Sequence, residues 1–231
     1  MTARRRFYKD VTVTDDLGIA LDGRPVKTPM KAALVLPTRA LADAVAAEWA
    51  EQGEEIKPAT MYLTKLANTA IDRVTAYREA IESEVLDYAN SDLVCYRTDR
   101  PPDLVARQVR GWDPIVDWAR TALDAPFEVT DGIVHRPQPE AAIAAFAVAV
   151  QGLTDFELAA FYTIMTITGS ALIAMMLARN ATLPETAWLA AHVDEDYQIE
   201  HWGQDDEARD RRIGRHTEFM ACCRFMELAG A

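Results

Sequence analysis

A stretch of 21 residues without a single charged side chain, Leu158 to Ala178, constrains the fold of this chain most. It is long enough to cross a bilayer as a helix. The small and hydroxyl side chains that recur along it at helical spacing are Ala159, Thr163, Thr166, Ser170 and Ala174. Such a ridge lets neighbouring helices approach closely. The stretch is therefore predicted to be a buried central helix, and stable membrane insertion is not expected.

The composition is that of a folded protein. Half of the 231 residues are hydrophobic and 26% are charged, which is enough for one large core or two smaller ones. The net charge of -12 disfavours nucleic acid as a partner, because phosphate binding depends on lysine and arginine. Cysteines spaced for neither a disulfide nor a metal loop indicate a reducing compartment. The cytoplasm is the simplest such compartment, and a trimmed organellar protein is the alternative.

The order of patterns along the chain predicts an α+β protein. Residues 1–60 are expected to form a small, mostly antiparallel β domain, and residues 61–231 a larger all-helical domain. The expected strands are Phe7 to Val13, Ile19 to Leu21, Pro25 to Thr28 and Ala33 to Leu36. Thr38 is the predicted N-cap of a helix that runs towards Gly53.

Several boundaries are predicted within the helical half. Asp113 and Pro114 are expected to begin a helix separate from the one before it. Asp131-Gly132 predicts a small hairpin between Phe127 and His135. Capping boxes are predicted at Thr154 to Glu157 and at Thr182 to Glu185, the second opening an acidic helix.

That acidic segment, Pro184 to Glu207, contains eight carboxylates and no lysine or arginine, together with Trp188, Tyr197 and Trp202. Carboxylates packed this densely repel one another unless a metal ion or a basic partner surface offsets the repulsion. On one continuous helix of about 100° per residue they fan outward instead of converging. Three hypotheses remain open: a solvated acidic face, a surface that binds a basic protein, and a metal-dependent enzyme. The enzyme would use His192, Asp196, His201 and Asp205.

Glu195 falls among the tryptophans on this helix, where a carboxylate needs a donor to avoid a desolvation cost. An internal arginine, an indole N–H or an arginine of a partner would each satisfy it. Elsewhere the chain shows no nucleophile beside a suitably spaced base and no glycine-rich phosphate loop. No catalytic residue, metal or cofactor is predicted, and the chain is not expected to be an enzyme.

Several sequence blocks occur together in order along nearly the whole chain. They are Arg6-Phe7-Tyr8-Lys9-Asp10-Val11, Leu21 to Pro29, Glu48-Trp49, Ile56-Lys57-Pro58, Leu66 to Asp72, Asp92 to Arg97, Gly169-Ser170, Asp194 to Ile199 and Trp202-Gly203. With these blocks the chain resembles the ATP synthase assembly chaperones that bind the free alpha subunit of the catalytic sector. It departs from the expected Met-Pro-Leu-Thr at Met61-Tyr62-Leu63-Thr64, and has Asp194 where glutamate is expected.

The resemblance implies a chaperone that holds the alpha subunit, prevents its aggregation and gives it up to the beta subunit. It implies a location in the bacterial cytoplasm, or in the mitochondrial matrix for a trimmed organellar form. It also implies a β domain followed by a helical domain, and functionally sensitive positions at Trp49 and at Asp194 or its neighbours. Trp49 is nevertheless expected to fill a core, as tryptophan on an amphipathic helix usually does. The residues predicted to bind the partner protein are Asp194, Glu195, Asp196, Glu200, Trp202 and Glu207.

Overall fold

The computed structural model describes residues 4–132 and 134–230, which form two compact units. The first unit comprises residues 4–78, 154–160 and 221–230, and the second comprises 79–132, 134–153 and 161–220. Helices α3, α6 and α10 contribute residues to both units.

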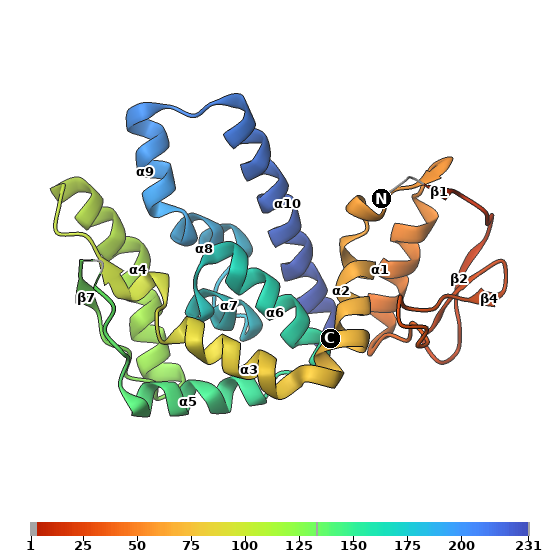
Figure 1. Ribbon diagram of the computed structural model, residues 1–231, viewed down its shortest axis with the longest axis horizontal. Coiled ribbons are helices and arrows are strands. Elements are labelled where there is room, and N and C mark those ends of the chain that lie inside the picture. Colours follow the sequence, from red (N-terminus) through yellow and green to blue (C-terminus); the bar gives the residue numbers. More distant parts are fainter. Residues whose placement is uncertain (1–3, 133, 231) are drawn as a thin grey trace. The chain divides into compact units, whose positions relative to one another are not determined.

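The described elements begin with strands and continue mainly as helices (Figure 1). The strands are β1 (Arg4–Arg5), β2 (Val11–Val13), β3 (Ile19–Leu21), β4 (Arg24–Pro25), β5 (Glu55–Ile56), β6 (Tyr96–Arg97) and β7 (Thr130–Asp131). The α-helices are α1 (Arg39–Ala50), α2 (Tyr62–Thr69), α3 (Thr75–Ala89), α4 (Pro102–Ala122), α5 (Glu140–Gln151), α6 (Asp155–Thr168), α7 (Ala171–Ala178), α8 (Pro184–Ala191), α9 (Val193–Trp202) and α10 (Asp206–Ala229). The shorter helical segments are η1 (Pro58–Thr60), η2 (Ala70–Val74) and η3 (Leu93–Cys95).

The first unit contains a three-stranded antiparallel sheet in the order β2-β3-β4, with Val11 opposite Leu21. Strands β1 and β5 form a second antiparallel pair. Tyr8, Leu21, Ile56 and Met61 form a small buried core beside the sheet. A small antiparallel sheet followed by helices confirms the predicted α+β class.

Helix α1 begins as predicted, because the Thr38 hydroxyl accepts a hydrogen bond from the N–H of Leu41 at 3.1 Å. Trp49, near the end of α1, packs against the small core, and its ring meets Tyr8 edge-on at 5.8 Å. Trp49 is only partly buried, so it packs against this core without filling it, and the expectation is met in part. The preceding Glu48 accepts hydrogen bonds from the N–H groups of Leu63 and Thr64, and so satisfies the first turn of α2.

Asp92 connects two elements of the second unit. Its completely buried carboxylate accepts hydrogen bonds from the N–H of Val94 in η3 and from the N–H of Leu172 at the start of α7. One side chain therefore satisfies two helix N-termini that would otherwise bury unpaired donors.

The prediction of a single central helix is wrong, because Gly169 and Ser170 divide this stretch into α6 and α7. Gly169 has φ +71°, a left-handed conformation that ends a helix, and Ser170 caps the next one by accepting from the N–H of Ile173. Thr166 is exposed, so the ridge of small side chains is not buried along its whole length. Among the described residues, no helix is both long and apolar enough to span a bilayer.

Two predicted helix boundaries are also wrong. Asp113 does not begin a helix, because α4 is continuous from Pro102 to Ala122 and Pro114 lies inside it. The Asp113 carboxylate instead receives a hydrogen bond from Arg97 at 2.7 Å. At the start of α8 the N-cap is Leu183, which makes no side-chain capping bond, so the box predicted at Thr182 does not form. The box at Thr154 is confirmed by its reciprocal bonds with Glu157.

The hairpin predicted between Phe127 and His135 is not present in the described residues. Gly132 has the predicted positive φ, but its N–H donates to the carbonyl of Arg97. Strand β7 accordingly pairs in parallel with β6. Ile133, which belonged to the predicted hairpin, lies outside the described residues.

Asp92 predicts a pH dependence of stability. Burial raises the pKa of its carboxyl from 3.8 to about 6. The folded chain therefore binds more protons than the unfolded chain between these values. The stability that this group contributes is present below about pH 4 and is lost as the pH rises through about 6, a change of about 3 kcal/mol.

We expect urea unfolding to show this loss in the native protein and not in Asp92→Asn, measured at both ends of that pH range. Equal pH dependence in the two proteins would rule out Asp92 as its source.

Candidate functional site

The acidic segment forms three helices, α8, α9 and the start of α10, and not the one continuous helix predicted. His192 interrupts it with φ -116° and ψ 20°, and Gly203 ends α9 with φ 78°. The Asp205 carboxylate accepts from the N–H of Ala208 and so starts the next helix. The stripes expected from a single helix therefore do not describe the surface.

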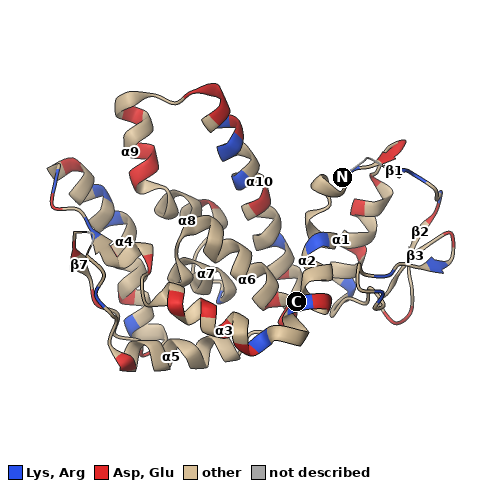
Figure 2. Ribbon diagram, viewed as in Figure 1, with Lys and Arg blue, Asp and Glu red and all other residues tan. Residues whose placement is uncertain are grey.

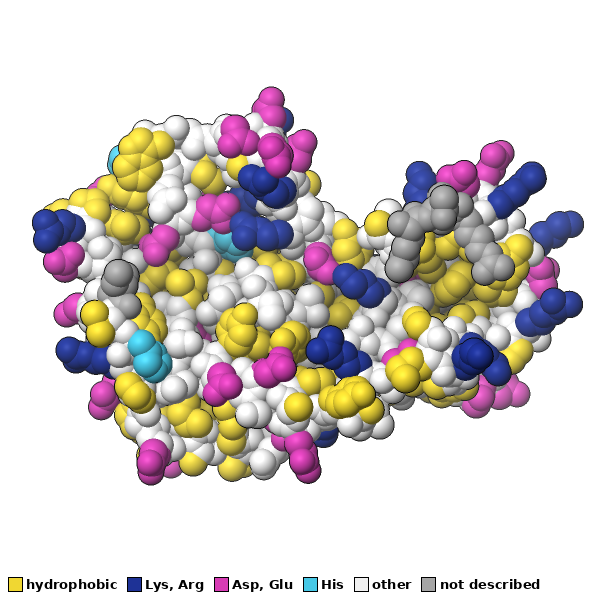
Figure 3. Space-filling model, in the orientation of Figure 1, with side chains coloured by type: hydrophobic (Ala, Val, Ile, Leu, Met, Phe, Trp, Pro, Cys, Tyr) yellow, Lys and Arg dark blue, Asp and Glu magenta, His cyan; other side chains and the backbone are white. Residues whose placement is uncertain are grey.

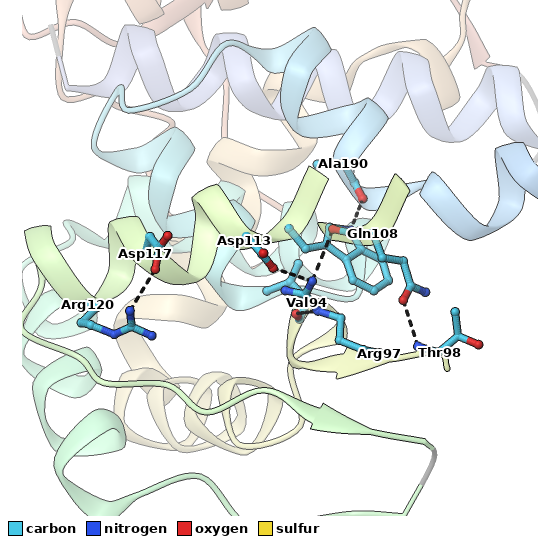
Figure 4. Close-up of polar contacts among 9 residues, drawn as sticks. Val94, Arg97, Thr98, Gln108, Asp113, Asp117, Arg120 and Ala190 are labelled. Atoms are coloured by element: carbon cyan, nitrogen blue, oxygen red, sulfur yellow. Dashed lines mark hydrogen bonds and ion pairs between the residues drawn. The ribbon is translucent and has the colours of Figure 1, made fainter. Parts of the chain in front are cut away.

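Asp194 lies in the first turn of α9 and is connected to a polar network on α4. Its carboxylate accepts a hydrogen bond of 2.8 Å from the Gln108 side-chain amide. The other end of Gln108 accepts from the N–H of Thr98, and its backbone carbonyl accepts from Arg97 (Figure 4). Asp194 is thus fixed in position by a side chain that is itself buried.

Arginines of α10 neutralise the next two carboxylates. Figure 2 shows acidic residues on α9 and basic residues on α10. Glu195 lies 2.8 Å from Arg215 and 3.4 Å from Arg212. Asp196 pairs with Arg212, whose side chain is only 17% exposed and lies over the ring of Trp188. Of the three donors considered for Glu195, the structure supplies the internal arginine.

The remaining carboxylates predicted to bind a partner also have internal partners, but they stay more exposed. Glu200 pairs with Arg107 of α4 at 2.6 Å, and this hydrogen bond lowers the pKa of Glu200. Glu207 pairs with Arg211, one turn further along α10, at 2.7 Å. The Glu200 side chain is 58% exposed and that of Glu207 is 81% exposed.

Trp202, the last residue of α9, is 76% exposed, the most of any large hydrophobic residue in the part of the chain that the structure describes. The space-filling view shows hydrophobic side chains over the C-terminal end of α9, with acidic side chains nearby (Figure 3). Trp188, in contrast to Trp202, is buried between His192 and Phe219. Of the two tryptophans in the acidic segment, only Trp202 is available for contact with another molecule.

The four residues of the metal hypothesis make other contacts. His192 and His201 each engage a backbone carbonyl through Nδ1, at 2.8 Å, while Asp196 and Asp205 bind Arg212 and the N–H of Ala208. Burial lowers the pKa of His192. Within residues 4–132 and 134–230, no group of three or more histidine, cysteine or carboxylate side chains is arranged to hold a metal ion.

The expectation that a metal or a partner must offset the acidic repulsion is therefore wrong, because Arg107, Arg211, Arg212 and Arg215 do so within the chain. The sequence contained a signal for these residues that the prediction did not use. Arg212 and Arg215 are three positions apart, the spacing that places two side chains on one helix face. The helix face that Arg212 and Arg215 contact is determined by tertiary packing. The sequence pattern does not identify that face.

Arg212 is predicted to stabilise α9. Arg212→Met would leave Asp196 without its mostly buried arginine partner and Glu195 with Arg215 alone, and we expect the free energy of unfolding to fall by about 2 kcal/mol. Arg209→Met is the matched control on the same helix, because Arg209 forms only an exposed pair with Asp206; a loss under about 0.5 kcal/mol is expected there. Equal losses in urea unfolding would contradict the role given to Arg212.

Known proteins share this arrangement of elements. Residues 5–120 match the family of the ATP12 chaperone protein. The crystal structure of a putative chaperone from Agrobacterium tumefaciens is 44% identical, with a TM-score of 0.93, over 98% of this chain and 86% of that one.

Atp12 from Paracoccus denitrificans is 36% identical, with a TM-score of 0.91, over 98% of each chain. The mitochondrial protein atp12 of Schizosaccharomyces pombe is 22% identical over 89% of this chain and 76% of its own length. The chain therefore belongs to the ATP12 family of ATP synthase assembly chaperones.

Proposed function

We propose that this chaperone binds the free alpha subunit of the ATP synthase catalytic sector, prevents its aggregation and releases it when the beta subunit replaces it. The free alpha subunit is called the client below. The contact surface that we propose consists of Asp194, Glu195, Asp196, Glu200, Trp202 and Glu207, here called the α9 surface. Membership of the chaperone family supports the class of function, and the geometry of α9 supports the location.

The observation that carries the location is the exposure of Trp202. A tryptophan exposed over three quarters of its surface leaves a large apolar area in contact with water, which a partner pocket would remove. Tryptophan is also among the residues that most often dominate binding energy at protein interfaces. Its position at the end of α9, beside carboxylates, matches an apolar anchor with a polar rim.

The internal arginines make this surface more suitable for binding. Because Arg212, Arg215 and Arg107 hold the α9 carboxylates, less side-chain freedom remains to be lost on association. Glu200 and Glu207 remain exposed enough to attract a basic patch of the client. Apolar contact would thus provide affinity, and the carboxylates would provide orientation and association rate.

A direct experiment uses purified chaperone and purified client without the beta subunit. The proposal predicts a complex on size-exclusion chromatography, less light scattering from the client alone, and loss of the complex when the beta subunit is added. A client that aggregates equally with and without the chaperone, and that forms no complex, would refute the proposal.

Trp202→Ala is predicted to weaken client binding by about 30-fold or more, as expected for an anchor worth about 2 kcal/mol. Thermal unfolding should change little, because most of the ring already contacts water. Tyr88→Ala removes another partly exposed aromatic residue outside the α9 surface and should bind normally. Equal client affinity of the two variants, measured by titration, would remove Trp202 from the contact.

Neutralising the two most exposed carboxylates of the α9 surface, in Glu200→Gln with Glu207→Gln, is predicted to slow association with the client several-fold at low salt. The dependence of the association rate on salt should also flatten, because charge steering acts on the approach of the partners. The control replaces Glu128 and Glu140, which are exposed elsewhere in the second unit, with glutamine. Stopped-flow kinetics that show the same loss in both double variants would indicate an effect of net charge alone.

A further inference from the structure

Next to the α9 surface lies an apolar pocket of about 540 Å³, contained entirely within the second unit. Helices α4, α7, α8 and α9 supply its walls. Its apolar lining includes Ile115, Ile173, Met176, Leu189 and Val193. Leu189 is 61% exposed. Because exposed apolar surface is unfavourable in water, the pocket is a place where a ligand gains binding energy by covering it.

The pocket is pre-formed by contacts behind its wall. The indole N–H of Trp112 on α4 donates to the carbonyl of Ala190, a lining residue on α8, at 2.7 Å. The guanidinium of Arg97 lies over the Trp112 ring, and Arg97 is itself held by Asp113, a pair drawn in Figure 4. The indole is therefore fixed. A ligand would therefore meet walls that need little rearrangement, which reduces the free-energy cost of binding.

Within the described part of the chain, one charged side chain at the pocket forms no ion pair. Three further lining residues are charged: Arg107, Arg110 and Asp196. Arg107 pairs with Glu200, and Asp196 pairs with Arg212. Arg110 is exposed and, among the described residues, forms no ion pair. The lining of an apolar pocket, on a chain of net charge -12, thus includes an exposed guanidinium that forms no ion pair within the described residues, and this group complements a carboxylate.

These features define the chemistry of the occupant. Small-molecule sites usually direct several polar groups at the ligand, whereas the lining of this pocket is mostly apolar, and Arg110 is its one charged side chain without an ion pair among the described residues. Leu189 lines the pocket and is also exposed, so apolar surface is available outside the pocket as well. Such surface suits a bound polypeptide that is longer than the pocket. A polypeptide segment with apolar side chains and one neighbouring aspartate or glutamate satisfies both features.

We propose that this pocket binds an apolar client segment whose adjacent carboxylate pairs with Arg110. The proposal rests on the function proposed above and adds the type of sequence that is recognised. The α9 surface attracts basic groups, and the pocket receives an apolar, acidic segment beside it. The two together would orient the client, because each accepts chemistry that the other rejects.

The test uses two pocket variants with matched controls. Arg110→Glu reverses the free charge, and Thr186→Trp places a large side chain at an exposed lining position of α8. The controls are Arg136→Glu and Val148→Trp, which make the same changes at exposed positions of the second unit away from the pocket. Thermal unfolding is measured for each variant, and Arg110→Gln and Thr186→Phe replace any variant that does not fold.

The probes are immobilised overlapping peptides that span the alpha and beta subunits, and the purified alpha subunit itself. We expect the native chaperone to retain peptides in which an apolar run adjoins aspartate or glutamate. The two pocket variants should weaken this binding about tenfold or more, and the two controls should not. Replacing the aspartate or glutamate of a bound peptide with its amide should weaken binding to the native chaperone. The same replacement should cause little further loss of binding to Arg110→Glu, because the carboxylate and Arg110 act as one pair.

The possible failures are distinguishable. If the native protein captures the alpha subunit and the pocket variants capture it equally well, the pocket inference is wrong and the proposed function stands. If peptides bind through the pocket while the free alpha subunit is not captured, the proposed function is wrong and the pocket inference stands. Absence of peptide binding, or equal losses in the variants and their controls, overturns the pocket inference.

Discussion

The ion pairs between the carboxylates of α9 and arginines of the neighbouring helices are the interaction on which the site depends. Without Arg212 and Arg215 of α10, Glu195 and Asp196 would repel each other on one turn of helix. Arg107 of α4 likewise offsets the charge of Glu200. The acidic segment is thus a folded surface with its repulsion already offset, and it needs neither a metal nor a partner in order to form.

This arrangement changes what the acidic residues contribute to binding. Carboxylates that already form ion pairs with arginines of the same chain add only modest affinity for a partner. The apolar area left in contact with water, at Trp202 and in the pocket beside α9, is the larger potential source of affinity. Charge would then determine which partner docks and in which orientation.

The sequence predicted features that depend on neighbouring residues and missed those that depend on tertiary packing. The strand-then-helix order, the Thr38 cap and the capping box at Thr154 were predictable because each involves residues a few positions apart. The parallel pairing of β7 with β6 was not, because the Asp-Gly pair predicts a turn without identifying the strand that follows it. The break at Gly169 was visible as a glycine followed by serine, but the uncharged stretch around it favoured one helix. The arginine partners of α9 required knowledge of which faces of α4 and α10 it meets.

The central claim is that the surface of α8 and α9 and the start of α10 contacts the client. Hydrogen–deuterium exchange of the chaperone, alone and with an excess of purified alpha subunit, tests it most directly. The account predicts slower exchange in residues 184–207 and in the part of α4 that lines the pocket, with no change in the small β sheet. A complex in which residues 184–207 exchange at the same rate as in the free protein, while other segments become protected, would contradict it.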